Sequence, residues 1–191
     1  MVNADGTAVD WQTPPSSAGG GGAVLLASTT VTASGQAAIT LSPLPTTGYR
    51  DLRIRARLSN VGGAIRYIAL RFGSGGVLDT GNNYGAQSQY LVSGAFHASA
   101  DFGLNAYYHR GALPNDGSMV VLDALVYDYA TTGLARAVKA TSTATSSAGP
   151  VWSGGQWKNT ADVIDTVQIV NLTSGESYAV GSTAEVYGIP G

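Results

Sequence analysis

Short runs in which apolar and polar residues alternate, separated by glycine-rich turns, make up most of this sequence. The clearest run covers residues 52–58, where Leu, Ile and Ala occupy every second position and three arginines stand between them: Arg53, Arg55 and Arg57. Because successive side chains of a β-strand point to opposite faces, this pattern predicts a strand with one buried and one cationic face. No window has the spacing of an amphipathic helix over three turns, so we expect a chain built almost entirely of strands.

The turns set the number of strands. The chain has 26 glycines and 7 prolines, which favour many tight turns because glycine adopts positive φ without steric cost. We predict a hairpin with its turn at Ser34-Gly35 and a further turn at Ser153-Gly154-Gly155. Strands are expected over residues 24–33, 36–41, 52–58, 65–72, 86–92, 102–109, 118–129, 134–145, 163–172 and 184–189. This spacing predicts a mainly antiparallel β-sandwich of the jelly-roll type, with a barrel as the alternative.

The beginning of the chain has a different character. Residues 1–17 show no periodic pattern, and residues 19–22 are four consecutive glycines. We predict an extended arm with a glycine hinge over residues 1–22, for which a disordered tail is the alternative, and one β-sandwich domain over residues 23–191.

The charge composition limits the classes of partner. Only 12% of the residues are charged, against about 25% in ordinary soluble domains, and the net charge is −2. This balance predicts no binding of nucleic acid, and it suits adhesins and virion shells. The N-terminus has no signal-peptide pattern and no apolar run is long enough to cross a bilayer, so we expect synthesis in the cytoplasm, no export by the ordinary secretory route and no membrane insertion. Such a chain would reach the outside of a cell if lysis released it.

Residues suited to catalysis are few. His97 and His109 are the only histidines, no G-x-S-x-G nucleophile elbow occurs, and there is no cysteine. Asp79, Asn82 and Asn83 form an oxygen-rich segment that we interpret as a turn rather than a calcium loop. We therefore predict a protein that is not an enzyme and has no catalytic residues, no metal site and no cofactor.

Two groups of residues are candidates for contact with a partner. The arginines at positions 53, 55 and 57 would face an anionic partner, or form an ordinary solvated strand face. Four aromatic residues would contact a host-surface glycan or another subunit, although core packing is the commoner role of such residues: Tyr107, Tyr108, Trp152 and Trp157.

The arm carries a recognisable motif. Its sequence ADGTAVDWQTPP, which begins at Ala4, resembles the ADGT-x-V-x-W-x-x-P linker of bacteriophage tail-fibre and virion proteins. Further short motifs follow in an order that resembles a β-sandwich module of phage structural proteins: TTGYRDLRIRAR ending at Arg57, RFG from Arg71, NNY from Asn82, WKNT from Trp157 and GSTAEVYGI ending at Ile189.

This resemblance implies a homotrimer without enzymatic chemistry, located in the virion. It implies a tail-fibre or head-fibre domain displayed on the particle surface for assembly and host attachment, with capsid or tail subunits as partners. A capsid decoration (cement) protein is the alternative, and a polysaccharide depolymerase is a weaker one. The resemblance also assigns virion attachment to residues of the arm: Asp5, Gly6, Val9, Trp11, Pro14 and Pro15.

Overall fold

The computed structural model describes residues 8–10, 22–61, 66–92, 95–113, 118–144 and 149–191. These residues form strands, turns and bends, and the described part of the chain contains no helix that could cross a membrane. The strands are β1 (Ala8–Asp10), β2 (Val24–Thr30), β3 (Ala38–Leu41), β4 (Asp51–Leu58), β5 (Asn60–Val61), β6 (Arg66–Ser74), β7 (Val77–Leu78), β8 (Tyr84–Val92), β9 (Ala95–Leu104), β10 (Tyr107–Leu113), β11 (Val120–Val126), β12 (Arg136–Ala144), β13 (Val151–Trp157), β14 (Thr166–Asn171), β15 (Ser177–Tyr178) and β16 (Thr183–Ile189).

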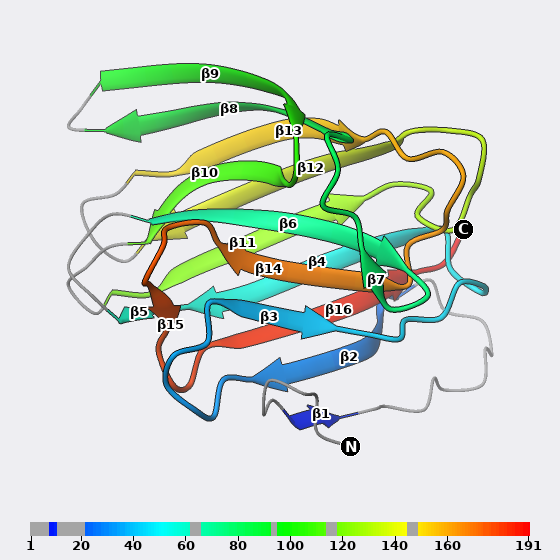
Figure 1. Cartoon of the computed structure of the whole chain (residues 1–191), viewed down its shortest axis with the longest axis horizontal. Coiled ribbons are helices and arrows are strands. Elements are labelled where there is room, and N and C mark those ends of the chain that lie inside the picture. Colours follow the sequence, from blue (N-terminus) through cyan, green and yellow to red (C-terminus); the bar gives the residue numbers. More distant parts are fainter. Residues whose placement is uncertain (1–7, 11–21, 62–65, 93–94, 114–117, 145–148) are drawn as a thin grey trace.

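Two antiparallel sheets pack face to face. The larger sheet has nine strands in the order β1-β2-β16-β4-β11-β12-β13-β8-β9, and the smaller has the order β10-β6-β14-β3, with β7 paired to β6. Figure 1 shows the smaller sheet lying over the larger one, with β9 at one border of the larger sheet and the short β1 at the other. The predicted all-β antiparallel sandwich is confirmed.

The strand pairing is nested. β2 pairs with β16, β3 with β14, β4 with β11, and β6 with β10, so the first half of the chain pairs with the second half in reverse order. A long hairpin that is rolled into two sheets has this order, and a jelly roll is built in this way. This pairing supports the predicted jelly-roll type, which stays a prediction. Two insertions, β8-β9 and β12-β13, extend the larger sheet beyond β11.

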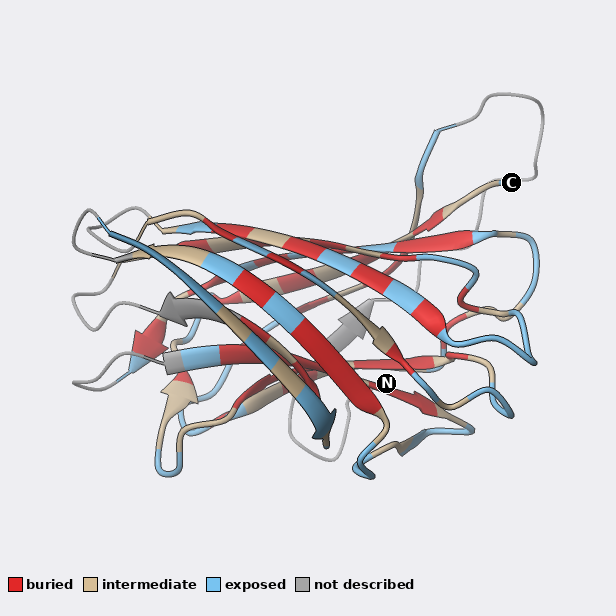
Figure 2. Cartoon of the chain, turned by 90° about the horizontal axis from the view of Figure 1, so that it is seen from above, coloured by how far each residue is buried: buried red, intermediate tan, exposed pale blue. Residues whose placement is uncertain are grey.

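The core lies between the sheets and follows the predicted alternation. Leu52, Ile54 and Leu58 of β4 are fully buried, while the three arginines between the apolar positions are exposed. Figure 2 shows the same alternation of buried and exposed residues along neighbouring strands. Each apolar side chain of this size stabilises the fold by about 1.5–3 kcal/mol when it is fully buried.

The predicted hairpin at Ser34-Gly35 is wrong. Gly35 does adopt a turn conformation, with φ of 87°, but β2 belongs to the larger sheet and β3 to the smaller one. The connection therefore crosses from one sheet to the other. Alternation along a strand shows which side chains are buried and does not show which strand is the neighbour, so a crossing and a hairpin have the same pattern.

The predicted turn at Ser153-Gly154-Gly155 is also wrong, because these residues lie inside β13. Gly155 is needed for a close approach rather than for a turn: an added Cβ would lie 2.0 Å from the carbonyl oxygen of Gly85 and 2.9 Å from the ring of Tyr107. The strand predicted over residues 102–109 is in fact two strands, β9 and β10, in different sheets. The chain changes sheet just after Gly103, whose φ is 66°.

Candidate functional site

His109 lies in a buried polar cluster between the sheets. Its Nδ1 lies 2.6 Å from the hydroxyl of Ser153 and its Nε2 lies 2.7 Å from that of Ser142. Tyr107 donates a hydrogen bond of 2.8 Å to Ser153. Burial lowers the pKa of His109 to about 4 and raises that of Tyr107 to about 12, so both side chains are neutral near pH 7. Because every member is buried and paired within the cluster, its role is to satisfy polar groups inside the core.

Asp79 likewise has its hydrogen-bonding capacity occupied. Its carboxylate accepts hydrogen bonds from the indole of Trp157 at 2.7 Å, from the amide of Asn83 at 2.9 Å and from the backbone of Gly81 at 2.9 Å. This geometry favours the turn interpretation over a calcium loop. The described residues contain no group of three or more His, Asp or Glu side chains placed to hold a metal ion.

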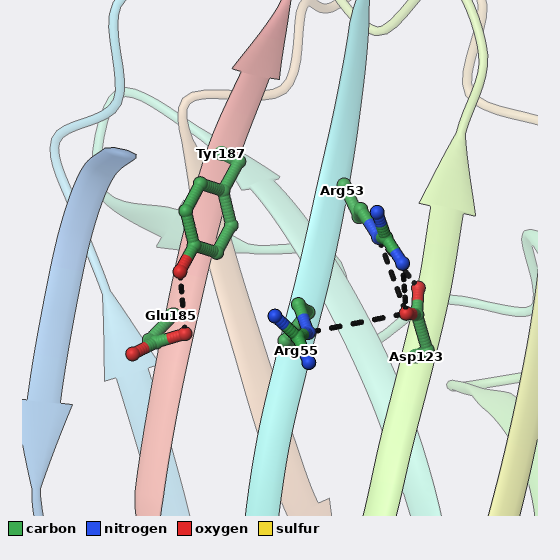
Figure 3. A network of polar contacts seen from close by, with 5 residues as sticks. All are labelled: Arg53, Arg55, Asp123, Glu185 and Tyr187. Carbon is green, nitrogen blue, oxygen red and sulfur yellow. Dashed lines mark hydrogen bonds and ion pairs between the residues drawn. The ribbon is translucent and has the colours of Figure 1, made fainter. Parts of the chain in front are cut away.

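The predicted arginine face carries carboxylates as well. Figure 3 shows Arg53 against Asp123, with hydrogen bonds of 2.5–3.1 Å, and Arg55 at 3.9 Å from the same carboxylate. Glu185 lies on the neighbouring strand and accepts a 2.7 Å hydrogen bond from Tyr187. The two carboxylates neutralise most of the charge of the three arginines, which weakens the case for an anionic partner at this face.

The four predicted aromatic residues have different environments. Tyr107 and Trp157 are fully buried, so their predicted contact with a glycan or subunit is wrong. They lie in the core because large aromatic side chains bury the most apolar area there. Tyr108 is half-buried and donates a 3.3 Å hydrogen bond to Asn105. Trp152 alone of the four is exposed, with 45% of its surface accessible.

Trp152 stands beside a groove on the outer face of the larger sheet. The groove has a volume of about 600 Å³ and crosses β12, β13, β8 and β9. We define the Trp152 groove by the outward-facing residues that line it, six through their side chains and Gly154 through its backbone: Gln87, Gln89, Ala98, Ala100, Lys139, Trp152 and Gly154.

Two further aromatic residues lie beside the groove on β9, and sequence reasoning missed both. Phe96 is 78% exposed and Phe102 is 62% exposed. They share the face of Ala98 and Ala100, and their separation along the strand is about 20 Å at the usual rise per residue. Alternation of apolar residues over residues 96–102 predicts a strand, but the sequence does not show that this strand, β9, ends the sheet among the described strands.

The predicted attachment arm is described only in part. Val9 lies in β1, where its backbone pairs with Thr29 of β2. The other arm candidates, Asp5, Gly6, Trp11, Pro14 and Pro15, lie outside the described residues.

Comparison with models of known protein families, with curated proteins and with solved structures finds no match.

Proposed function

We propose that this chain is a non-catalytic structural protein of a bacteriophage virion, a trimeric fibre- or head-fibre-type domain displayed on the particle surface for assembly and host attachment. The observation that carries the proposal is a set of exposed aromatic side chains at one end of the larger sheet: Phe96 and Phe102 on the border strand β9, and Trp152 on β13, two strands further in. Large exposed apolar side chains that gather on one part of a surface mark a site of contact with another molecule. The ADGT-type linker motif supports the assignment to a virion.

The polar interior favours contact over chemistry. The imidazole of His109 is enclosed, and both of its nitrogens are bonded to serine hydroxyls. A depolymerase of the common type needs two carboxyl groups that face each other across a substrate groove. Among the described residues that line the Trp152 groove there is no carboxylate, which argues against the depolymerase alternative at this position.

The border strand β9 supports self-association. It is ten residues long and, among the described strands, pairs only with β8, so it forms a border of the larger sheet. Long open edges that carry exposed apolar side chains bind another strand unless something covers them. A neighbouring subunit of the trimer would cover this edge and bury Phe96.

The cement alternative differs in what holds the molecule together. A decoration protein would be ordered by the capsid lattice, and the arm, whose residues 8–10 add a strand to β2, would be its means of attachment.

Light scattering on the purified chain, with and without residues 1–22, tests the proposal. We expect the full chain to have three times its 19.4 kDa mass. The shortened chain should likewise have three times its own, smaller mass, because the sandwich itself would hold the trimer. If both forms are monomers, self-trimerisation is wrong and the cement alternative replaces it.

A further inference from the structure

We propose that the Trp152 groove binds a neutral saccharide. The inference rests on the proposed display function and names the ligand that the displayed face would bind.

The strand register builds the groove from short and long side chains. In one row across the sheet, Lys139 pairs with Gly154, which pairs with Gln87. In the adjoining row, Trp152 pairs with Gln89. Gly154 leaves the middle of the groove open, since no atom lies within 4 Å of an added Cβ there.

The β9 side of the groove is shallow for the same reason. Ala100 pairs with Gln87 and Ala98 pairs with Gln89, so two methyl groups complete the two rows. From β12 to β9 the groove crosses three strand spacings, which is about 14 Å. A volume of about 600 Å³ lies within the range of small-molecule sites.

The polar groups of the groove are free to bind a ligand. Within the described structure, no hydrogen bond or ion pair involves the side chains of Gln87, Gln89, Lys139 or Trp152. Each glutamine amide offers both a donor and an acceptor, and the indole offers a donor. Adjacent hydroxyl groups of a sugar need this combination, while its C–H face packs against an exposed aromatic ring.

The charge of the groove selects a neutral ligand. Of the lining residues that the structure describes, Lys139 alone is charged. These lining residues offer no carboxylate to a metal ion or a cationic ligand, and only one cation, Lys139, to a polyanion. A neutral saccharide needs no charged partner. Free amides also distinguish the groove from a protein interface, whose centre is usually apolar and closely packed.

The test uses the full chain and three neutral probes: the trimer of N-acetylglucosamine, maltotriose and a galactose disaccharide. Saturation-transfer NMR and tryptophan fluorescence would follow binding up to roughly 10 mM, where even a weak site is occupied. We expect at least one probe to bind. Gly154→Leu, which fills open space and leaves the core untouched, and Trp152→Ala should each weaken binding about tenfold or more.

Val180→Ala is the matched control, because Val180 is exposed and lies outside the groove. It should bind as the unchanged chain does. Absence of binding by all three probes overturns the inference, and so does binding that both groove variants retain. If Trp152→Ala instead lowers the mass seen by light scattering and no probe binds, the groove is a subunit contact and the inference is wrong. A monomer that binds a probe would refute the trimer and leave the groove assignment standing.

Discussion

At the scale of single residues, the buried polar side chains explain more of the stability of this protein than of its binding. His109 is the clearest example, because a neutral imidazole donates a hydrogen bond from one nitrogen and accepts one at the other, and two serine hydroxyls lie at those positions. Protonation would place an uncompensated charge between the sheets.

The first prediction concerns the pH dependence of stability. The pKa of His109 is about 4 in the folded chain, below the ordinary 6.5, so between these values the unfolded state binds more protons. Stability from this group is therefore complete above pH 6.5 and falls as the pH drops towards 4, by about 3 kcal/mol in all. Urea unfolding at several pH values would measure the slope, which His109→Gln should reduce. The exposed His97→Gln is the control and should retain the slope.

The second prediction compares two buried tyrosines. The hydroxyl of Tyr84 accepts a 2.9 Å hydrogen bond from the backbone N–H of Phe72 and donates one of 3.0 Å to the carbonyl of Asp79. The buried hydroxyl of Tyr178 has no hydrogen-bond partner in the described structure. Tyr84→Phe should destabilise the fold by about 1–3 kcal/mol, because a buried backbone donor loses its acceptor, whereas Tyr178→Phe should be neutral or stabilising. Equal losses in thermal unfolding would contradict this assignment.

At the scale of the strands, two adjacent glycines of β13 have different structural roles. Gly155 faces inward against the backbone of β8, and Gly154 faces outward into the Trp152 groove. Neither has a positive φ, so the turn chemistry of glycine is not the reason for either. The inner position requires the absence of a side chain, and the outer one leaves space for a ligand.

The third prediction follows from that difference. Gly155→Ala should lower the free energy of unfolding by about 1–3 kcal/mol or more, because its Cβ would lie 2.0 Å from a backbone oxygen. Gly154→Ala should leave stability unchanged or raise it slightly, since alanine loses less chain entropy on folding than glycine. Chemical denaturation of the two variants checks the pair, and a larger loss at Gly154 would refute the inward and outward assignment.

At the scale of the whole molecule, the larger sheet extends well past the jelly-roll-like pairing through β12-β13 and β8-β9. Figure 1 shows these strands continuing one border of the sheet up to β9. The extension enlarges the core with buried side chains such as Tyr84 and Trp157, and on its outer face it carries Phe96, Phe102 and the Trp152 groove.

The fourth prediction tests the role of that border in assembly. Phe96→Lys places a charge on the exposed edge strand, and it should shift the trimer towards monomer in a light-scattering dilution series by about tenfold or more in concentration. Val77→Lys introduces the same charge at an exposed position of β7 and should leave the mass unchanged. A trimer that is indifferent to Phe96→Lys would place the subunit contact elsewhere.

The sequence by itself determined the class of fold and the faces of the most regular strands. The alternation over residues 52–58 predicts correctly which residues of β4 are buried, because the two-residue period of a strand is a local property. The absence of a helical pattern and the abundance of glycine likewise suffice to predict an all-β chain. For the candidate site, the sequence named Trp152 as a candidate contact residue but did not show that it is exposed while Trp157 is buried.

Tertiary structure alone decided which strands are neighbours, and with them the site. Pairing of β2 with β16 rather than β3, and the crossing of the chain between β9 and β10, depend on contacts between distant segments. The same holds for Gly155, where a side chain is excluded by the backbone of Gly85, seventy positions earlier in the sequence. Local periodicity shows which face of each strand is buried, but it does not show which strand lies next to it. The groove exists only because β12, β13, β8 and β9 lie side by side.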